Sequence, residues 1–343
     1  MKEYQIGVLG AGAWGTALSL LLARNGHLVT LWSAIPEEVA ILQKERGLPE
    51  KLADVVLPEQ VTITGNLEEA CRNKQLIVFA VASPYVRDTA KQAAPFLDRQ
   101  VPIANVAKGI EESTLLTLTE VIESELLAQN GEAGDVAVLS GPSHAEEVGR
   151  LMPTTCVAGA KTRKTACLIQ DLFMSEFFRV YTSPDVIGIE LGGSLKNVIA
   201  LAAGIADGLG FGDNTKAALI TRGINEISRL GMALGGRLET FAGLSGIGDL
   251  IVTCTSHHSR NHNAGYLIGT GKTPKEAMEE VHQVVEGVHC ARAAWKLAQR
   301  HGVEMPIVEQ VNEVLFQGKS PKDAVSELLL RDKRIENQNL EWK

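Results

Sequence analysis

The sequence is poor in cysteine and proline, has no excess of positive charge and lacks long apolar runs. Its five cysteines are odd in number, far apart and without a Cys-x-x-Cys pair, so a disulfide framework is not expected. Free thiols are typical of a reducing compartment. The cysteines are Cys71, Cys156, Cys167, Cys254 and Cys290.

The charge balance and the N-terminus exclude several partners and locations. Basic residues number 33 and acidic residues 41, for a net charge of −8, whereas nonspecific binders of nucleic acid or acidic membranes usually carry a basic excess. Met1-Lys2-Glu3-Tyr4 leads straight into an apolar strand, without the basic and apolar regions of a signal peptide. Glycines or a charge interrupt every apolar stretch that approaches the ~20 residues of a membrane span. These features predict a cytoplasmic protein that binds no nucleic acid and does not insert into membranes.

The length and composition of the chain favour an ordered protein of two domains. The chain has 343 residues, and about 150 residues per domain is the usual expectation. Hydrophobic residues make up 45% and charged residues 22%, which excludes a disordered chain. Glycine is abundant, with 33 residues, but there are only 12 prolines and no low-complexity tract. We therefore expect these glycines to serve ordered backbone.

Short apolar runs alternate with helical stretches in the first half of the chain, a pattern that predicts a doubly wound α/β sheet. The predicted strands cover residues 5–9, 28–32, 76–81, 101–107, 136–140, 155–158 and 178–181. The predicted helices between them cover residues 15–25, 37–46, 85–94 and 115–129. Beyond residue 185 only helices are predicted, at residues 189–206, 215–234, 260–268, 273–285 and 291–300. We expect a sheet domain at residues 1–185 and an all-α domain at residues 186–343, with the boundary at Ser183-Pro184.

A glycine-rich turn joins the first predicted strand to the first predicted helix. Gly10-Ala11-Gly12-Ala13-Trp14-Gly15 has the pattern Gly-x-Gly-x-x-Gly. Gly10 suits a tight turn, Gly12 close approach of the backbone to a pyrophosphate, and Gly15 tight packing of helix on strand. The start of the helix offers free N–H groups to phosphates. The stretch predicts a dinucleotide site on a Rossmann-like sheet, and a purely structural glycine turn is the alternative.

The second predicted strand ends without the charged residue that often completes such a site. Leu31-Trp32 is followed by Ser33-Ala34-Ile35, which offers neither an acid for the ribose of NAD nor an Arg for the 2′-phosphate of NADP. Ser33 can hydrogen-bond to either form. The choice between NADH and NADPH stays open.

Three charged residues are candidates for catalysis. Lys108 follows the predicted strand at residues 101–107, at the sheet edge where α/β folds bind ligands. Lys196 is the one charge between Leu191 and Ala206, and Asp249 is the one between Thr240 and Ser259. Burial lowers the pKa of a lysine toward the range of acid–base catalysis, and a buried charge needs a partner. Lys196 and Asp249 therefore suggest a catalytic pair; a structural ion pair, and a solvated loop lysine at Lys108, are the alternatives.

Ser259-Arg260-Asn261 opens a predicted helix, where an Arg fork and free N–H groups suit a phosphate. Nearby histidines at 257, 258 and 262 raise the alternative of zinc, since His258 and His262 are four residues apart. No Cys or carboxylate with paired ligand spacing accompanies them, so no metal site is expected.

Together these stretches resemble the bacterial-type NAD(P)-dependent glycerol-3-phosphate dehydrogenase family. The matching stretches span nearly the whole chain in family order and include Gly10-Ala-Gly-Ala-Trp-Gly, Ala107-Lys-Gly, Leu139-Ser-Gly-Pro-Ser-His, Gly193-Ser-Leu-Lys-Asn, Gly246-Ile-Gly-Asp-Leu and Ser259-Arg-Asn. The resemblance implies reversible reduction of dihydroxyacetone phosphate to sn-glycerol 3-phosphate with NADH or NADPH, for phospholipid synthesis. It also implies a homodimer and a second domain like that of 6-phosphogluconate dehydrogenase.

The resemblance further implies roles for individual residues. Lys196 would donate or accept the proton at the C2 oxygen, with Asp249 holding it, and Lys108 would contact substrate and cofactor. Substrate positions are Lys108, Gly141, Ser143, Lys196, Asn197, Asp249, Thr253, Ser259, Arg260 and Asn261, the last three at the substrate phosphate. Cofactor positions are Gly10, Gly12, Ala13, Trp14, Gly15, Ser33, Lys108, Ala145, Arg260, Val284 and Glu286.

The chain departs from the family pattern at three places. The family often has Ser where Ala13 stands, Arg or His at or near Ala34, and Arg where His262-Asn263 follows the Ser-Arg-Asn cluster. These departures remove contacts to the cofactor and positive charge near the phosphates. Two rival functions remain: a two-domain dehydrogenase of hydroxy acids, and a nicotinamide-nucleotide sensor without catalysis.

Many glycines lie near the proposed substrate residues. Gly141, Gly192, Gly193, Gly246 and Gly248 flank those residues, where we expect close approach of the backbone. Four further glycines are expected to loosen the end of the helix that carries Lys196. They are Gly204, Gly208, Gly210 and Gly212.

Overall fold

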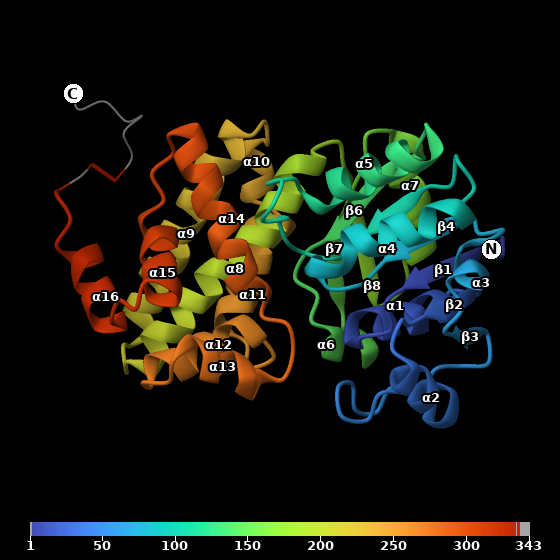
Figure 1. The fold of residues 1–343 in the computed structure, drawn as a ribbon, viewed down its shortest axis with the longest axis horizontal. Coiled ribbons are helices and arrows are strands. Elements are labelled where there is room, and N and C mark those ends of the chain that lie inside the picture. The colour runs from blue at the N-terminus through green and yellow to red at the C-terminus, as the bar shows by residue number, and fades with distance from the viewer. Residues whose placement is uncertain (1, 334, 337–343) are drawn as a thin grey trace.

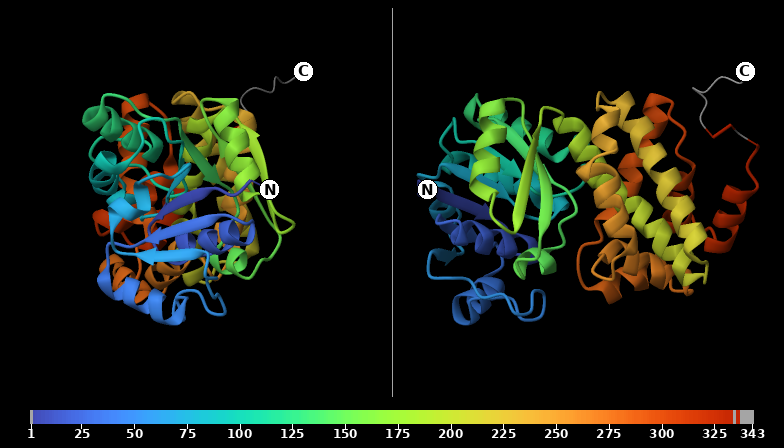
Figure 2. Two further views of the ribbon diagram at one scale, coloured as in Figure 1. Left: turned by 90° about the vertical axis from the view of Figure 1, so that its right-hand side faces the viewer. Right: turned by 180° about the vertical axis from the view of Figure 1, so that it is seen from behind.

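The computed structural model describes residues 2–333, 335 and 336, and residues 1, 334 and 337–343 of the predicted domains lie outside it. A sheet with helices on both faces lies beside a bundle of helices (Figures 1 and 2). The strands are β1 (Gln5–Leu9), β2 (Leu28–Trp32), β3 (Val61–Thr64), β4 (Leu76–Phe79), β5 (Ile103–Asn105), β6 (Val136–Ser140), β7 (Thr154–Gly159) and β8 (Phe178–Ser183). They are ordered β3-β2-β1-β4-β5-β6-β7-β8, and all neighbours are parallel except β6 and β7.

The helices around the sheet cover it in two layers, because side chains alternate between the faces of each strand. In β4, Leu76 and Val78 belong to one apolar core and Ile77 and Phe79 to the other. The first core is closed by α1 (Ala13–Arg24), α2 (Pro36–Glu45), α6 (Ala145–Gly149) and α7 (Arg163–Phe173). The second is closed by α3 (Leu67–Cys71), α4 (Val86–Ala93) and α5 (Leu118–Asn130), with short 3-10 turns at Ser83–Tyr85 and Ala94–Phe96. The central strands β4, β5 and β6 are therefore buried on both faces.

The bundle is built around one buried helix, α8 (Val186–Gly208). Around it pack α9 (Asp213–Ala233), α10 (Leu238–Phe241), a π-helical turn at Leu244–Gly248, α11 (Asp249–Thr255), α12 (Arg260–Gly269), α14 (Glu286–His301) and α15 (Pro306–Phe316). Two outer helices, α13 (Pro274–Val281) and α16 (Pro321–Leu329), complete the bundle (Figure 1). Within the described residues α8 alone is long and apolar enough to cross a membrane, but 83% of its apolar window is buried, as in a core helix.

Helices α8 and α12 touch through their main chains. A methyl group added to Gly204 would lie 2.0 Å from the backbone oxygen of His262, and one added to Gly208 would lie 2.3 Å from that of Tyr266. From the other side, a methyl group at Gly265 would lie 2.2 Å from the backbone oxygen of Leu201. The expectation that Gly204 and Gly208 loosen the helix is therefore wrong. They let the main chains of the two helices lie in direct contact.

Several elements differ from the sequence prediction. Strand β3 was not predicted, because it is a four-residue edge strand after an irregular stretch. The helix predicted at 273–285 ends at Val281, since His282 adopts a left-handed conformation with φ 52°. The helix predicted at 291–300 already begins at Glu286. Helices α7, α15 and α16 and the antiparallel pairing of β6 with β7 were also not predicted.

Candidate functional site

The turn between β1 and α1 has the shape that a dinucleotide pyrophosphate needs. Gly10 has φ +116° and a methyl group there would lie 2.6 Å from the backbone of Val81, while one at Gly15 would lie 1.9 Å from the oxygen of Gly10. Around Gly12, by contrast, a methyl group would meet no described atom within 4 Å. Gly12 caps α1 without a side-chain hydrogen bond, and the first turn holds no acid. The backbone N–H groups are therefore open to an anion beside Gly12, so a dinucleotide fits here.

Ala13 and Trp14 form the first turn of α1, and Ser33 follows β2 beside this turn. The Gly10 amide donates to the Trp32 oxygen at 2.9 Å, which places the end of β2 next to the glycine turn. The Ser33 hydroxyl donates to Glu38 Oε2 at 2.5 Å and accepts from the Ile35 amide at 3.2 Å. Ala34 is exposed. Glu38 is thus an acid at this edge that the sequence prediction missed, because it lies on α2 rather than directly after the strand.

Two lysines from opposite parts of the molecule share one buried carboxylate. Lys108, after β5, donates to Asp249 Oδ2 at 2.7 Å and to the Gly141 oxygen at 3.0 Å. Lys196, in the middle of α8, donates to Asp249 Oδ1 and lies 2.8 Å from Thr253 Oγ1. Asp249 is 1% exposed and Lys196 is 6% exposed. The three charged candidate residues, distant in the sequence, therefore meet where the carboxyl edge of the sheet faces the bundle.

The protonation of Lys196 is set by its burial. Loss of solvent lowers the pKa of Lys196 to about 7; the Asp249 charge opposes this shift and the Lys108 charge adds to it. Both the protonated and the neutral amine are thus accessible near neutral pH. A lysine in this state can give a proton to a developing alkoxide and take it back.

Close backbone contacts support this cluster. A methyl group at Gly193 would lie 2.7 Å from Ser140 Oγ, and one at Gly192 would lie 2.5 Å from the Ser245 oxygen. One at Gly246 would lie 2.0 Å from the Phe241 oxygen, so these three glycines confirm the expected close approach. Gly141 has φ +148°, and a methyl group there would lie 3.0 Å from the backbone of Cys156. A methyl group at Gly248 would have only ordinary van der Waals contacts.

The residues after Gly141 line the same edge of the sheet. Ser143 Oγ donates to the Gly141 oxygen at 3.0 Å, and Ala145 is the first residue of α6. Between them, the His144 ring lies 5.8 Å from that of His258, and its Nε2 has no hydrogen-bond partner in the described part of the chain. Burial and then the charge of Lys196 lower the pKa of His144. His144 was not among the predicted site residues.

The start of α12 joins α8 through a pair of asparagines. Asn261 Nδ2 donates to Asn197 Oδ1 at 2.9 Å, and Asn261 Oδ1 accepts from the Gly287 amide at 2.8 Å. Ser259 caps α12 by accepting from the His262 amide at 3.2 Å. Asn197 follows Lys196 directly, so the Ser-Arg-Asn cluster lies beside the lysine cluster.

Arg260 is exposed and donates to Gln283 Oε1 at 3.4 Å. None of the ion pairs formed among residues 2–333, 335 and 336 uses its charge. The guanidinium is therefore available to an anionic ligand at the start of α12.

Glu286 connects the bundle to the sheet. At the start of α14, its Oε1 accepts from the Ser83 amide at 3.1 Å and its Oε2 accepts from the Ser83 hydroxyl. Burial raises the pKa of this carboxyl group. Val284 lies in the loop just before α14. Glu286 thus reaches the sheet domain just after β4, next to β1 and its glycine turn.

Two buried acids that the sequence prediction missed hold α8 in place. Asp185 caps α8 through the Gly188 amide at 3.0 Å and accepts from the Arg237 amide at 2.9 Å. Glu190 accepts from the Thr119 amide at 3.0 Å, and burial raises its pKa to about 6. Glu190 is an acid in an otherwise apolar helix, which is the signal that identified Lys196. The prediction missed it because the apolar segment considered began one residue later.

The histidines that suggested zinc have other partners. His262 Nε2 lies 2.8 Å from Asp207 Oδ2, and His258 contacts His144. No group of three or more potential metal ligands occurs among the residues that the structure describes.

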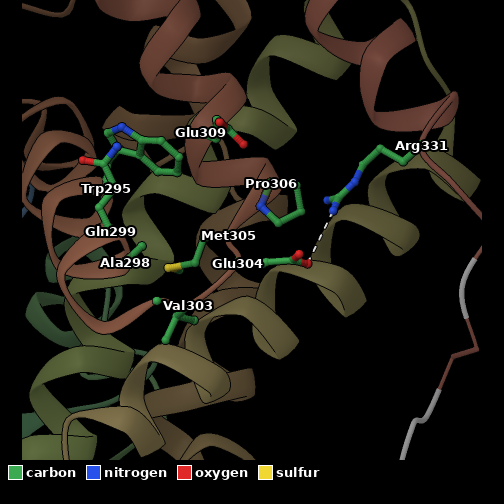
Figure 3. A pocket seen from close by; sticks show the side chains of 10 residues that line it. Trp295, Ala298, Gln299, Val303, Glu304, Met305, Pro306, Glu309 and Arg331 are labelled. Atoms are coloured by element: carbon green, nitrogen blue, oxygen red, sulfur yellow. Dashed lines mark ion pairs between the residues drawn. The ribbon is translucent and has the colours of Figure 1, made fainter.

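A separate hollow lies between α14 and α15, lined by Trp295, Met305, Pro306 and Glu309 among others (Figure 3). An ion pair of Glu304 with Arg331, with 3.7 Å between nitrogen and oxygen, lies at its side. None of the predicted site residues lines it, so it takes no part in the candidate site.

The comparisons with known proteins agree with this geometry. A model of the N-terminal part of NAD-dependent glycerol-3-phosphate dehydrogenase matches residues 5–166, and a model of its C-terminal part matches residues 185–326. Glycerol-3-phosphate dehydrogenase [NAD(P)+] of Agathobacter rectalis is 59% identical over 99% of both chains. That of Fusobacterium nucleatum is 54% identical over 98% of this chain and 99% of the relative.

A solved structure gives the same result for the fold. The crystal structure of glycerol-3-phosphate dehydrogenase from Coxiella burnetii matches with a TM-score of 0.91 at 38% identity. The match covers 96% of this chain and 99% of that one. The predicted Rossmann-like sheet followed by a helical part is thus confirmed, and the chain belongs to the NAD-dependent glycerol-3-phosphate dehydrogenase family.

Proposed function

We propose that this protein reduces dihydroxyacetone phosphate reversibly to sn-glycerol 3-phosphate with NADH or NADPH, as a source of glycerol phosphate for phospholipid synthesis. Membership of the family supports an NAD(P)-dependent oxidoreductase acting on a CH–OH group. The observation that carries the chemistry is the buried carboxylate of Asp249 between the amines of Lys108 and Lys196.

The bound nicotinamide supplies or accepts the hydride. In our proposal Lys196 gives its proton to the C2 oxygen of the substrate during reduction and recovers it during oxidation. Asp249 orients that amine, and Thr253 Oγ1 accepts a second hydrogen bond from it at 2.8 Å. We assign to Lys108 a substrate contact from the sheet side, where its amine lies 3.0 Å from the Gly141 oxygen. The cluster thereby combines a proton source with positive charge for a developing oxyanion.

The remaining predicted residues divide between the two ligands. We assign the substrate phosphate to Ser259, Arg260 and Asn261, and further substrate contacts to Gly141, Ser143 and Asn197. We assign the cofactor to the glycine turn with Ala13 and Trp14, and to Ser33, Lys108, Ala145, Arg260, Val284 and Glu286. The open backbone beside Gly12 supports this division, as does the Arg260 guanidinium, which forms no ion pair within the described part of the chain.

A spectrophotometric assay with dihydroxyacetone phosphate, run separately with NADH and NADPH, tests the proposal. We expect oxidation of the cofactor that depends on the phosphorylated ketone. Activity on a 2- or 3-hydroxy acid but none on dihydroxyacetone phosphate would favour the hydroxy-acid dehydrogenase. Cofactor binding without turnover of any phosphoketone would favour the sensor.

The two directions of the reaction should respond oppositely to pH. Because burial lowers the pKa of Lys196 to about 7, the protonated amine that reduction requires is lost as the pH rises above that value. The neutral amine that oxidation requires is lost as the pH falls below it. We therefore expect kcat/KM for reduction to fall, and kcat/KM for oxidation to rise, as the pH increases through about 7. Initial rates between pH 5.5 and about 9 check this; profiles that change in the same direction would contradict the role of Lys196.

Replacing Arg260 should mainly weaken binding of the substrate. A guanidinium–phosphate contact is worth about 1.5–3 kcal/mol, so Arg260→Ala should raise the KM for dihydroxyacetone phosphate by about tenfold or more, with a smaller change in kcat. Arg300→Ala, an exposed arginine at the end of α14, is the matched control and should leave KM unchanged. A KM for Arg260→Ala equal to that of the control would remove Arg260 from the phosphate site.

We also propose a cytoplasmic homodimer with a domain boundary at residue 185. The five cysteines are free, which supports a reducing compartment. Strand β8 ends at Ser183 and α8 begins at Val186, which supports the boundary. The homodimer rests on the family resemblance.

A further inference from the structure

The edge of the sheet at the end of β2 carries a buried acid that the sequence pattern does not reveal. Glu38 lies in the first turn of α2 and is only 9% exposed. Its Oε2 accepts from the Ser33 hydroxyl at 2.5 Å, and its Oε1 lies 3.1 Å from Lys51 Nζ. Ser33 itself is 4% exposed. The carboxylate is therefore held against the residue that follows β2.

The Glu38 carboxylate lies near the glycine turn, at the place where a bound dinucleotide would have its adenosine ribose. The Gly10 amide donates to the Trp32 oxygen, so the turn and the end of β2 are adjacent. In dinucleotide-binding sheets the ribose of the adenosine half lies at this end of the second strand, and an acid there selects NAD whereas an arginine accommodates the 2′-phosphate of NADP. Glu38 replaces, from the following helix, the acid that the strand itself does not provide.

Two basic residues that follow Glu38 in the chain, Arg46 and Lys51, are already engaged. Arg46 donates to the backbone oxygens of Leu57 at 3.2 Å and Val61 at 2.8 Å, and also to that of Pro58. The Lys51 amine is paired with Glu38 itself. A phosphate dianion would therefore meet a carboxylate whose counter-charge is a single lysine, with side chain 44% exposed. This arrangement favours a neutral ribose hydroxyl over a phosphate.

We propose that Glu38 makes this protein discriminate against the 2′-phosphate of NADPH and prefer NADH. The inference rests on the proposed nicotinamide cofactor but not on the reaction, so it is tested by binding in the absence of substrate. If the proposed reaction is not observed, the cofactor preference can still hold. If the preference is not observed, the proposed reaction can still hold.

The experiment measures the Kd of the wild-type protein for NADH and for NADPH by fluorescence titration. We expect NADPH to bind about tenfold more weakly than NADH. Glu38→Gln should remove most of this difference by tightening NADPH, while the Kd for NADH changes by less than about threefold. Glu37→Gln removes an exposed acid one residue away and should leave the ratio of the two Kd values unchanged. Lys51→Met removes the counter-charge of Glu38 and should raise the ratio of the Kd for NADPH to the Kd for NADH above that of the wild type.

The proposal is overturned if the wild type binds NADPH as tightly as NADH or more tightly. It is also overturned if Glu38→Gln leaves the ratio unchanged, weakens both cofactors equally, or changes the ratio no more than Glu37→Gln. Thermal unfolding of each variant shows whether it is folded. Should Glu38→Gln not fold, the wild-type titrations decide: weaker binding of NADPH than of NADH supports the proposal, and equal or tighter binding of NADPH overturns it.

Discussion

Lys196→Ala should lower kcat for reduction of dihydroxyacetone phosphate by about 10³-fold, because general acid–base catalysis by a positioned group contributes about 10²–10⁴-fold. The variant removes the more deeply buried of the two amines and leaves Asp249 paired with Lys108. The glycine turn lies on β1 and α1 and is untouched, so the Kd for NADH should stay within about threefold of the wild type. Rates at saturating substrate and a fluorescence titration with NADH measure the two quantities.

Lys275→Ala serves as the control for Lys196→Ala. The Lys275 side chain is 84% exposed and lies 3.9 Å from Glu279 on the same helix, so its loss should not change kcat. If Lys196→Ala keeps kcat within about tenfold of this control, the proton comes from another group and the assignment of Lys196 is wrong.

Asp249→Asn should lower kcat/KM for reduction by about 10²-fold and shift its pH dependence. The carboxylate accepts hydrogen bonds from both Lys108 and Lys196, and its charge raises the pKa of Lys196 against the effect of burial. Without that charge the pKa of Lys196 falls, so the protonated amine is lost at a lower pH than in the wild type. The decrease of kcat/KM should therefore begin below pH 7, in addition to the loss of orientation, which costs about 10²-fold.

Asp213→Asn is the control for Asp249→Asn, since Asp213 is exposed in the first turn of α9. It should leave both the rate and the pH profile unchanged. Thermal unfolding must be followed as well, because breaking a buried ion pair is destabilising. A lower melting temperature for Asp249→Asn with an unshifted pH profile would mean that Asp249 supports the fold without setting the proton affinity of Lys196.

Much of the sheet could be predicted because its strands are apolar runs bounded by polar residues. The predictions at residues 5–9, 28–32 and 136–140 coincide with β1, β2 and β6. Strand β3, with the sequence Val-Thr-Ile-Thr, pairs with β2 alone, and so short an edge strand has little signal of its own. Helices α15 and α16 begin at Pro306 and Pro321. Proline is common in the first turn of a helix, so these two prolines are a sequence signal for both helices.

The lysine cluster was predictable from physics, since a charge alone in an apolar segment needs a partner once it is buried. That reasoning led to Lys196 and Asp249, which the structure joins, but not to the sharing of Asp249 by Lys108. The same reasoning did not identify Glu38, because the sequence does not show that α2 folds back toward Ser33. The asparagine contact between α8 and α12 escaped it for the same reason, because it depends on how the two helices cross.

The contact between the main chains of α8 and α12 limits the length of the substrate that can bridge the two helices. Lys196 lies two turns before Gly204 on one helix, and Arg260 lies near the start of the helix that bears Gly265. Main chains in contact cannot approach further, and a larger side chain at either glycine would push them apart. The contact therefore fixes the separation between the backbones that carry the proton-donating amine and the proposed phosphate site. Ketones in which the carbonyl and the phosphate are one carbon further apart should be poor substrates, however well each end is recognised.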